Sequence, residues 1–459
     1  MAQADSSKMA GSVPAELSSA CADVAAVGPT DAVGGKQAQY VAAPASTAEA
    51  AALLRAAAGL GLAVVPRGSG SRLDWGQAPT SCDLIVDTRR MDQVLEHAAG
   101  DQVVAVQAGI RLDELAKVLA TAEQRLALDA PSSSDGVSGT VGGLIATGAA
   151  GPLRYRYGSP RDLLIGITVV RADGTVAKSG GKVVKNVAGY DIGKLFAGSL
   201  GTLGLITEAT FRLHPLPEAT VWVMLDCPDS ATAASAVRAI ADSPVVPSAI
   251  ELSWASATAP ISVSALIEGD ADSVAGRTDR LRELLDRATA GQSSARTKRA
   301  DDRPGPHTLA GGGAADEAFR VLRPLSDGRE PTGTLVRVAF WPGQLTAVLT
   351  AIRAAADAAG LDPAIGGSAG AGVLEVSVRA EAAVEAVADF VAVLRAGLDG
   401  LSDGLPPSRA SAVVLCAPAA VRDSVDMWGR VPSLALMRAV KDQFDPEHRM
   451  APGRFAGGI

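Results

Sequence analysis

Three glycine-rich segments contain the residues of this sequence best suited to hold a ligand through backbone contacts. The first, PRGSGS at residues 66–71, directly follows the apolar run LAVV. It lacks both the GxxxxGK[ST] and the GxGxxG spacing, which disfavours the two common nucleotide-binding turns. Consecutive small residues can leave backbone N–H groups free to form a concave nest for an anion such as a pyrophosphate. A plain turn between strands explains this segment alone equally well.

The other two segments change the interpretation of the first. Residues 131–151, PSSSDGVSGTVGGLIATGAAG, hold six glycines, and residues 198–207, GSLGTLGLIT, place three glycines at intervals of three. Such a composition is costly in backbone entropy unless something must approach the main chain closely. Flexible linkers rarely carry Val, Leu and Ile inside the run. Three loops of this kind predict a long ligand wrapped in backbone contacts, and a dinucleotide cofactor fits that description better than a compact substrate.

The elements that must position these loops are mixed helices and strands. Ser46 and Glu49 form a capping box ahead of the helical run TAEAAALLRAAAGLG, for which Gly59 and Gly61 are plausible terminators. Apolar runs predict strands at 62–66, 83–88 and 102–109, and a helical pattern starts at Arg111. From residue 219 to about 420, helical segments again alternate with apolar strands. The sequence therefore predicts an α+β protein.

The division of the chain follows from its breaks in composition. The length of 459 residues exceeds one ordinary core and predicts at least two domains. We expect an N-terminal tail or short helix at 1–36, a first domain at 37–217 and a second α+β domain at 218–420. Within the second domain, residues 288–316 are polar, Gly-rich and Pro-containing, which predicts a mobile loop. Residues 421–459 form a C-terminal segment.

Charge and cysteine content exclude several classes of protein. The formal net charge of -8 argues against nucleic acid as the main partner. No apolar run approaches the roughly 20 residues of a membrane-spanning helix, and the N-terminus lacks the pattern of a signal peptide. The four cysteines are far apart without a CxxC pair, so the sequence predicts no disulfide framework, iron–sulfur centre or metal site. We expect a cytoplasmic protein.

The order of these pieces resembles the flavoproteins of the vanillyl-alcohol oxidase and para-cresol methylhydroxylase (PCMH) type. The resemblance runs from about Gln37 to Pro217 and resumes in FDPEHRMAPGR at 444–454. It implies a PCMH-type FAD-binding domain at 37–217, a second substrate or cap domain, and a C-terminal segment that returns to the FAD domain. The residues that it assigns to the cofactor, together with Trp75 as a stacking candidate, are Pro66, Arg67, Gly68, Ser69, Gly70, Ser71, Trp75, Pro131, Gly139, Thr140, Gly142, Gly143, Ala146, Thr147, Gly148, Tyr157, Gly204 and Ile206.

The stretches GPLRYRYGSPRDLLIG and GGKVVKNVAGYDIGKLFAGSLGTLGLITE look more particularly like the FAD-binding component of the bacterial glycolate oxidase complex. That resemblance implies two partners, a homologous catalytic flavoprotein subunit and an iron–sulfur subunit. It also implies a 2-hydroxyacid dehydrogenase complex, with attachment to the inner face of the membrane only through those partners. A small hydroxy acid would be the substrate.

Two departures from the family pattern bear on mechanism. Ser71 stands where members with covalently attached flavin often carry a His, so we expect FAD to be held without a covalent bond. Catalytic members also carry a His-rich GHxGDGNxH motif in the second domain, whereas this chain has four histidines and only His307 between 219 and 440. The usual proton acceptor is therefore missing.

The candidate catalytic residues follow from the chemistry that hydroxy acid oxidation requires. Flavin must receive a hydride, one group takes the hydroxyl proton, and a cation anchors the carboxylate. The cationic candidates are Arg72, Lys182, Lys185 and Arg454, and Tyr190 and Asp191 are candidates near the ring. Several of these residues have an alternative role. The lysines could form a solvated or partner-binding face, and Tyr190 and Asp191 could hold a domain junction. Trp75, the stacking candidate, could simply pack in the core.

Three functions stay open from the sequence. The first is an FAD-binding subunit of a glycolate oxidase-like complex that passes electrons from flavin to a partner. The second is a self-sufficient FAD-dependent dehydrogenase or oxidase of a hydroxy acid or alcohol. The third is a structural flavoprotein subunit whose FAD only stabilises an interface.

Overall fold

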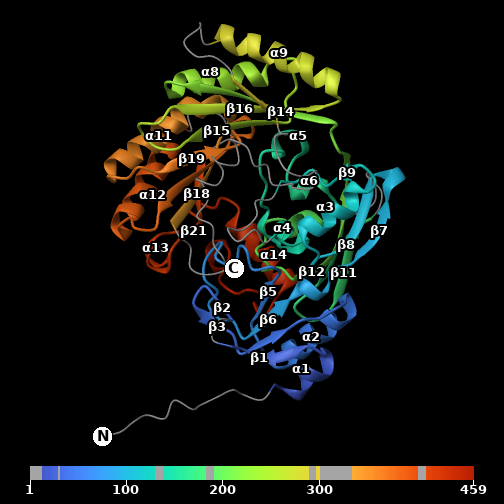
Figure 1. Ribbon diagram of the computed structural model, residues 1–459. Helices are drawn as coiled ribbons and strands as arrows, with labels where there is room; N and C mark the ends of the chain where they lie inside the picture. Colours follow the sequence, from blue (N-terminus) through green and yellow to red (C-terminus); the bar gives the residue numbers. More distant parts are fainter. Residues whose placement is uncertain are drawn as a thin grey trace.

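The computed structural model describes residues 13–28, 31–129, 138–181, 191–288, 296–299, 333–401 and 410–459. Three sheets of four, five and eight strands, together with their helices, make up most of this part of the chain (Figure 1). The predicted α+β class is confirmed. None of the described helices combines the length and apolarity needed to cross a lipid bilayer.

The four-stranded sheet carries the first glycine-rich loop. Its strands, in spatial order, are β1 (Val24–Ala26), β4 (Tyr40–Ala42), β6 (Leu84–Asp87) and β5 (Val64–Arg67). β4, β6 and β5 run parallel, and β1 is antiparallel to β4. α1 (Ala15–Ala20) packs against α2 (Thr47–Gly59) beside this sheet. Residues within the expected N-terminal tail therefore contribute both a helix and an edge strand.

The predicted start of α2 is confirmed, with one difference in its capping. The Ser46 side chain accepts a hydrogen bond from the Glu49 N–H at 3.1 Å. The Glu49 carboxylate does not complete the box at Ser46, however. It accepts from the N–H groups of Ala45 and Ala22 at 2.8 and 2.9 Å. The carboxylate thereby ties the segment after α1 to the start of α2, which the local sequence pattern could not indicate.

The five-stranded antiparallel sheet carries the third glycine-rich segment at the start of its central strand. In spatial order its strands are β11 (Val176–Gly180), β10 (Leu164–Val170), β12 (Leu205–Arg212), β8 (Val103–Gln107) and β7 (Val94–Ala98). Associated with this part of the chain are the helices α3 (Leu112–Ala120), α4 (Val141–Thr147), α5 (Arg154–Tyr157), α6 (Pro160–Leu163) and α7 (Gly193–Phe196). A two-stranded ladder of β9 (Gln124–Arg125) and β13 (His214–Pro215) leads toward the third sheet.

The eight-stranded sheet is antiparallel in every neighbouring pair. Its spatial order is β17 (Arg296–Arg299), β14 (Ala219–Cys227), β16 (Ile261–Gly269), β15 (Ala249–Trp254), β19 (Ala364–Gly367), β20 (Val373–Arg379), β18 (Gly333–Ala339) and β21 (Ser411–Cys416). β17 lies within the segment expected to be a mobile loop, so residues 296–299 of that segment form an edge strand. The rest of residues 289–316 lies outside the described residues.

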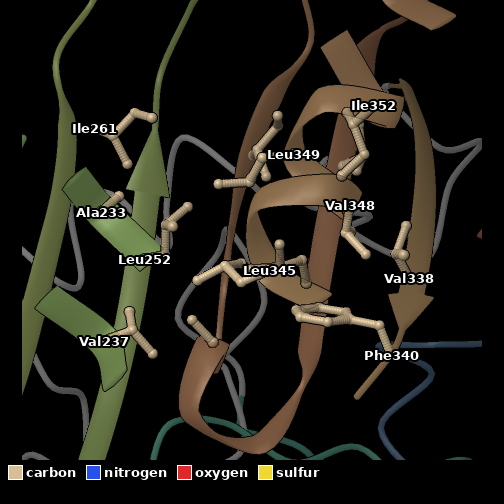
Figure 2. Close-up of a cluster of buried hydrophobic side chains, with 14 of the residues drawn as sticks. Ala233, Val237, Leu252, Ile261, Val338, Phe340, Leu345, Val348, Leu349 and Ile352 are labelled. Atoms are coloured by element: carbon tan, nitrogen blue, oxygen red, sulfur yellow. The ribbon is translucent and has the colours of Figure 1, made fainter. Parts of the chain in front are cut away.

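Helices cover one face of this large sheet and bury the largest core cluster. They are α8 (Ser230–Ala241), α9 (Ala271–Ala288), α11 (Leu345–Ala358) and α12 (Val384–Asp399) (Figure 1). In α11, Leu345, Val348, Leu349 and Ile352 recur at helical spacing and are all buried. Figure 2 shows them among side chains of α8, β15, β16 and β18. The opposite face of the sheet contacts α5 through β15, so the sheet lies directly beside the glycine-rich loops.

The C-terminal segment returns to the first sheet. After α13 (Ala419–Ser424) and α14 (Leu434–Phe444), residues 449–451 run alongside β5. The Val64 N–H donates to the Arg449 carbonyl and the Ala451 N–H donates to the Val64 carbonyl, both at 2.8 Å. The segment thus extends the sheet beyond β5, next to the loop that follows this strand.

Candidate functional site

The three glycine-rich segments converge on one pocket. Described residues from the loop after β5, from α4 and from the start of β12 line it together with the C-terminal segment. The lining residues are Pro66, Arg67, Gly68, Ser69, Gly70, Ser71, Arg72, Leu73, Thr88, Thr140, Gly142, Gly143, Ala146, Thr147, Leu200, Gly201, Gly204, Leu205, Ile206 and Arg454. We call this the glycine pocket.

The loop at 68–71 presents free backbone donors to this pocket. Among the described residues, the N–H groups of Gly68, Ser69, Gly70 and Ser71 have no backbone hydrogen-bond acceptor. Gly70 has φ +81°, in the left-handed region that favours glycine. A Cβ at Gly68 would collide with the side chain of Thr140, the N-cap residue of α4. Only a residue without a side chain therefore lets this loop and α4 approach so closely, and consecutive free N–H groups form the nest expected for an anion.

Arg67 cannot offer a free charge to a ligand. Its guanidinium pairs with Asp31 at 2.8 Å and with Asp87 at 3.1 Å. Both carboxylates already compensate the positive charge, so the contribution of Arg67 to the pocket wall is its backbone and its packed stem.

Arg454 connects the C-terminal segment to the same loop. Its side chain is almost fully buried, and one guanidinium nitrogen donates to the carbonyl oxygens of Leu73 and Trp75, each at 2.8 Å. Its Nε has no hydrogen-bond partner among the described residues. Burial lowers the pKa of Arg454 to about 10, which still leaves the group charged at neutral pH. A buried cation with one unsatisfied donor beside the pocket is suited to an electron-rich ligand atom.

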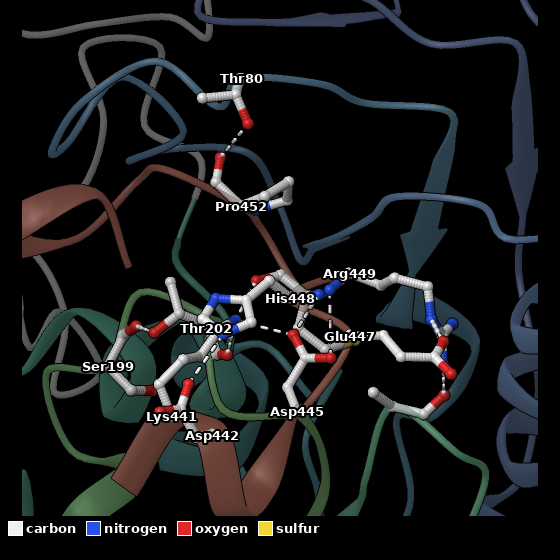
Figure 3. Close-up of polar contacts among 12 residues, drawn as sticks. Thr80, Ser199, Thr202, Lys441, Asp442, Asp445, Glu447, His448, Arg449 and Pro452 are labelled. Carbon is white, nitrogen blue, oxygen red and sulfur yellow. Dashed lines mark hydrogen bonds and ion pairs between the residues drawn. The ribbon is translucent and has the colours of Figure 1, made fainter. Parts of the chain in front are cut away.

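A buried ion pair fixes the loop before β12 (Figure 3). Lys441 on α14 and Asp445 are both fully buried, and the Lys441 Nζ donates to Asp445 Oδ2 at 2.7 Å. The same ammonium donates to the carbonyl oxygens of Thr202 at 2.7 Å and Met450 at 2.9 Å. Thr202 lies between two glycines that line the pocket. One side chain therefore holds a wall of the glycine pocket and the C-terminal segment together.

A second pocket, of about 320 Å³, adjoins the first and shares Thr147 and Leu200 with it. It lies between the segments around α4 to α6 and the strands β18 and β21 of the large sheet. Its lining residues are Trp75, Gly76, Thr147, Gly148, Arg154, Ser159, Arg161, Ala197, Gly198, Leu200, Arg337, Val413, Val414, Leu415 and Trp428. Three arginines and no acidic side chain line it within the described part of the chain. We call it the arginine pocket.

The residues expected to hold the cofactor fall into five groups. Two of them, Trp75 and Gly148, line the arginine pocket, and Gly139 lies beside the loop near Arg72. Tyr157 lines neither pocket, and Pro131 lies outside the described residues. The others all line the glycine pocket: Pro66, Arg67, Gly68, Ser69, Gly70, Ser71, Thr140, Gly142, Gly143, Ala146, Thr147, Gly204 and Ile206.

Tyr157 lies instead at the junction of the two halves of the molecule. Its hydroxyl accepts from Arg125 at 3.1 Å and donates to Glu268 on β16 at 3.3 Å. Arg125 and Glu268 form a buried ion pair at 2.8 Å, and His214 packs edge-on against the Tyr157 ring at 4.7 Å. Burial lowers the pKa of His214 to about 4, so this ring is neutral at neutral pH. The group joins the β9–β13 ladder to the large sheet.

The candidate catalytic residues are dispersed. Lys185 and Tyr190 lie outside the described residues, as does Lys182. Asp191 is exposed, pairs with Lys194 at 2.8 Å and lines neither pocket. Arg454 and Arg72 line the glycine pocket, whereas Trp75 is buried between the guanidinium groups of Arg72 and Arg337, at 5.6 and 5.4 Å from its ring centre.

Sequence reasoning missed the residues that come from distant segments. Arg154, Arg337 and Lys441 were not singled out. Leu200 and Gly201 lie inside the third glycine-rich segment, but neither was assigned to the cofactor. Arg154 stands inside the quoted stretch GPLRYRYG, where a charged residue between small and aromatic ones was an available signal. Arg337 interrupts the apolar strand TLVRVAF, which is a second such signal. No local pattern marks Lys441.

The described residues contain no cluster of His, Cys, Asp and Glu that could hold a metal ion. The His97 ring forms a hydrogen bond with the Gln124 side chain at 3.0 Å. The His448 ring forms one with the Asp442 carboxylate at 2.8 Å, in a surface turn. All four cysteines are free and buried.

Comparison with known proteins identifies the part of the chain that forms the glycine pocket. Residues 38–180 match the family model described as an FAD binding domain. The glycolate oxidase subunit GlcD of Bacillus subtilis is 36% identical over 212 residues, which cover 46% of this chain and 44% of that protein. The D-lactate dehydrogenase of Archaeoglobus fulgidus is 37% identical over 172 residues, 38% of either chain. These matches span less than half the length of either relative.

The likeness to solved structures extends over nearly the whole chain. A structure of p-cresol methylhydroxylase with substrate bound superposes with a TM-score of 0.71 at 14% sequence identity, covering 96% of this chain and 95% of that one. At this level of identity the likeness concerns the fold.

The glycine pocket fits part of FAD. Free N–H groups at 68–71 suit a diphosphate, and the unsatisfied Nε of Arg454 suits a carbonyl or phosphate oxygen. Its volume of about 90 Å³ is far below that of the whole cofactor, so the remainder would extend along the neighbouring surface and toward the arginine pocket. With the match over residues 38–180, the chain carries an FAD-binding domain and has the fold of the p-cresol methylhydroxylase type of flavoprotein.

Proposed function

We propose that this chain is an FAD-dependent oxidoreductase of small hydroxy acids that works as the FAD-binding subunit of a glycolate oxidase-like assembly. One observation carries the proposal: a pocket of free backbone donors continues into a pocket lined by arginines. The first suits the anionic part of FAD, and the second suits an anionic substrate next to it. The names of the similar proteins, a glycolate oxidase subunit and a D-lactate dehydrogenase, support the same class of reaction.

In this proposal the residues 37–217 and 421–459 hold the cofactor, and residues 218–420 cover the reacting end. Bound FAD would accept the two electrons and the hydrogen released from the carbon that bears the hydroxyl group. The N–H groups of Gly68 to Ser71 would bind the diphosphate, and Arg454 would orient a cofactor oxygen. The close packing of the loop against α4 would exclude water from this contact.

We further propose that FAD is held without a covalent bond. Ser71 ends the loop where a tethering His would stand, and no described residue that lines the glycine pocket is a His, Cys or Tyr. Acid denaturation should therefore release all the flavin into the supernatant. Yellow colour that stays with the precipitated protein would refute the non-covalent attachment.

The subunit role is tested by reduction of the flavin in the isolated chain. Saturated with FAD and mixed anaerobically with glycolate or D-lactate, the chain alone should bleach its flavin only slowly. A partner flavoprotein subunit and an iron–sulfur subunit should then be needed for turnover. Rapid bleaching by the isolated chain would instead establish a self-sufficient enzyme. This is the second candidate function, and it is favoured by the fact that the arginine pocket is formed by this chain alone.

A further inference from the structure

One arginine of the arginine pocket, Arg154, has no direct hydrogen-bond or ion-pair partner for its side chain among the described residues. It lies on α5 and is half-buried. By contrast Arg156, on the same helix, donates to the Val246 carbonyl at 3.4 Å and lies over the Tyr157 ring. The conformation of Arg154 therefore leaves its five N–H donors directed to whatever occupies the pocket or its neighbouring solvent.

A second arginine stands in the same pocket in a fixed orientation. Arg337 on β18 pairs with Glu375 on β20 at 3.0 Å, and its guanidinium lies 5.4 Å from the centre of the Trp75 ring. Its Nε is buried without a hydrogen-bond partner among the described residues. The contacts with Trp75 and Glu375 restrain this guanidinium group, and its buried Nε remains an unsatisfied donor.

The two guanidinium groups are close enough to influence one another. Burial, and after it the positive charge of Arg337, lowers the pKa of Arg154 below its ordinary value, against the opposing influence of Glu375, Glu251 and Asp129. Glu251 is completely buried on β15, and this burial raises its pKa well above the ordinary value. Glu375 is already paired with Arg337, and no acidic side chain is among the described residues that line the pocket.

We infer that Arg154 and Arg337 form a site, within the arginine pocket, for the carboxylate of a small organic acid. Planar guanidinium groups match the two oxygens of a carboxylate, and Val413, Leu415 and Trp428 give the same pocket an apolar wall against which a carbon chain can pack. The inference rests on the proposed function for the identity of the acid as a hydroxy acid. The binding of the carboxylate itself rests only on the pocket.

The test uses oxalate as a probe. Oxalate carries carboxylates but no hydroxyl-bearing carbon, so it can bind without donating a hydride. Its dissociation constant is measured on the FAD-loaded full-length protein by equilibrium dialysis and, separately, by the change in the flavin absorbance spectrum. The variant Arg154→Met should weaken oxalate binding at least about tenfold, because it removes charge-assisted hydrogen bonds to the carboxylate. Arg154→Lys should show an intermediate loss. Ethylene glycol, which has no carboxylate, should not bind measurably.

The matched control is Arg156→Met, which removes the same charge from the same helix but outside the pocket. It should leave the oxalate dissociation constant unchanged. Arg337→Met is expected to weaken oxalate binding too, and far-UV circular dichroism with FAD content shows whether each variant keeps its fold. Equal oxalate affinity in the wild type, Arg154→Met and Arg154→Lys, or no oxalate binding by the wild type, would overturn the carboxylate site.

The outcomes separate this site from the proposed function. If oxalate and glycolate bind through Arg154 but no hydroxy acid reduces the flavin with or without partner subunits, the carboxylate site stands and the proposed oxidation fails. If hydroxy acids reduce the flavin and Arg154→Met leaves their KM unchanged, the oxidation stands and the site assigned to Arg154 fails.

Discussion

The buried pair of Lys441 and Asp445 allows a quantitative test of how the glycine pocket is held together. Replacing Lys441 by Met removes three charge-assisted hydrogen bonds of 2.7–2.9 Å from a side chain that is 0% exposed. The carboxylate of Asp445 keeps the N–H groups of Arg449 and Met450 as donors but loses its only cationic partner among the described residues. Removing one member of a buried pair costs about 3–5 kcal/mol, so the free energy of unfolding should fall by that amount.

The same substitution should reach FAD, because the lost donor holds the carbonyl of Thr202 between two pocket-lining glycines. A loosened loop has to be ordered again when FAD binds. A hydrogen bond to a charged group is worth about 1.5–3 kcal/mol, and a loss at the lower end of this range raises the Kd for FAD about tenfold. Urea unfolding of the FAD-free protein measures the first effect. Quenching of FAD fluorescence, recorded well below the unfolding transition, measures the second.

Two further variants make the result interpretable. Lys117→Met breaks an exposed pair with Glu114 and should leave both quantities essentially unchanged. The double variant Lys441→Met, Asp445→Asn removes the uncompensated charge and should recover part of the lost stability. A change of less than about 1 kcal/mol in Lys441→Met would refute the assigned role of the ion pair in stability. Lost stability with an unchanged Kd for FAD would show that the pair does not position the loop.

Three other predictions concern the pocket, a buried carboxyl group and the core. Gly68→Ala should raise the Kd for FAD more than tenfold, because the new Cβ collides with the side chain of Thr140, the N-cap residue of α4. Gly100→Ala has open space around it and should leave the Kd unchanged. Equal Kd values for the two variants would contradict this packing. Burial raises the pKa of Glu251 in the folded protein, so the wild type loses stability as the pH rises above about 4.5, the pKa of an exposed Glu. Gln does not titrate, so the stability of Glu251→Gln relative to the wild type should increase over the same pH range, as measured by urea unfolding. A pH-independent difference would argue against a buried, ionisable carboxyl group. Leu349→Ala should lower the free energy of unfolding by about 2–5 kcal/mol, and Leu436→Ala, 67% exposed, should change it little, both by the same measurement.

The sequence indicates the glycine pocket well because its chemistry is local. Free N–H groups, left-handed backbone and close approach all depend on small residues in short runs, and such runs can be read directly at 66–71 and 139–148. The family resemblance then assigns these runs to one cofactor. The folded chain brings them to one pocket, although their roles in binding stay a prediction.

The arginine pocket could not be predicted in the same way because its residues are brought together only by tertiary packing. Arg154 and Arg337 are 183 positions apart in the sequence (337 minus 154), and each lies in a stretch that local periodicity explains as a short helix or a strand. Tyr157, which the resemblance assigns to FAD, lies in a polar junction with Arg125 and Glu268, two residues that are 143 positions apart in the sequence. Its role in FAD binding stays a prediction.

The return of the C-terminal segment to β5 has a consequence for biosynthesis. The loop at 66–71 emerges from the ribosome early, but Lys441 and Arg454, which hold the pocket walls, are translated more than 360 residues later. During that interval β5 is an uncovered edge strand and the nest lacks one wall. We therefore expect stable FAD binding only after residues 441–454 have left the ribosome and the C-terminal segment has packed beside β5.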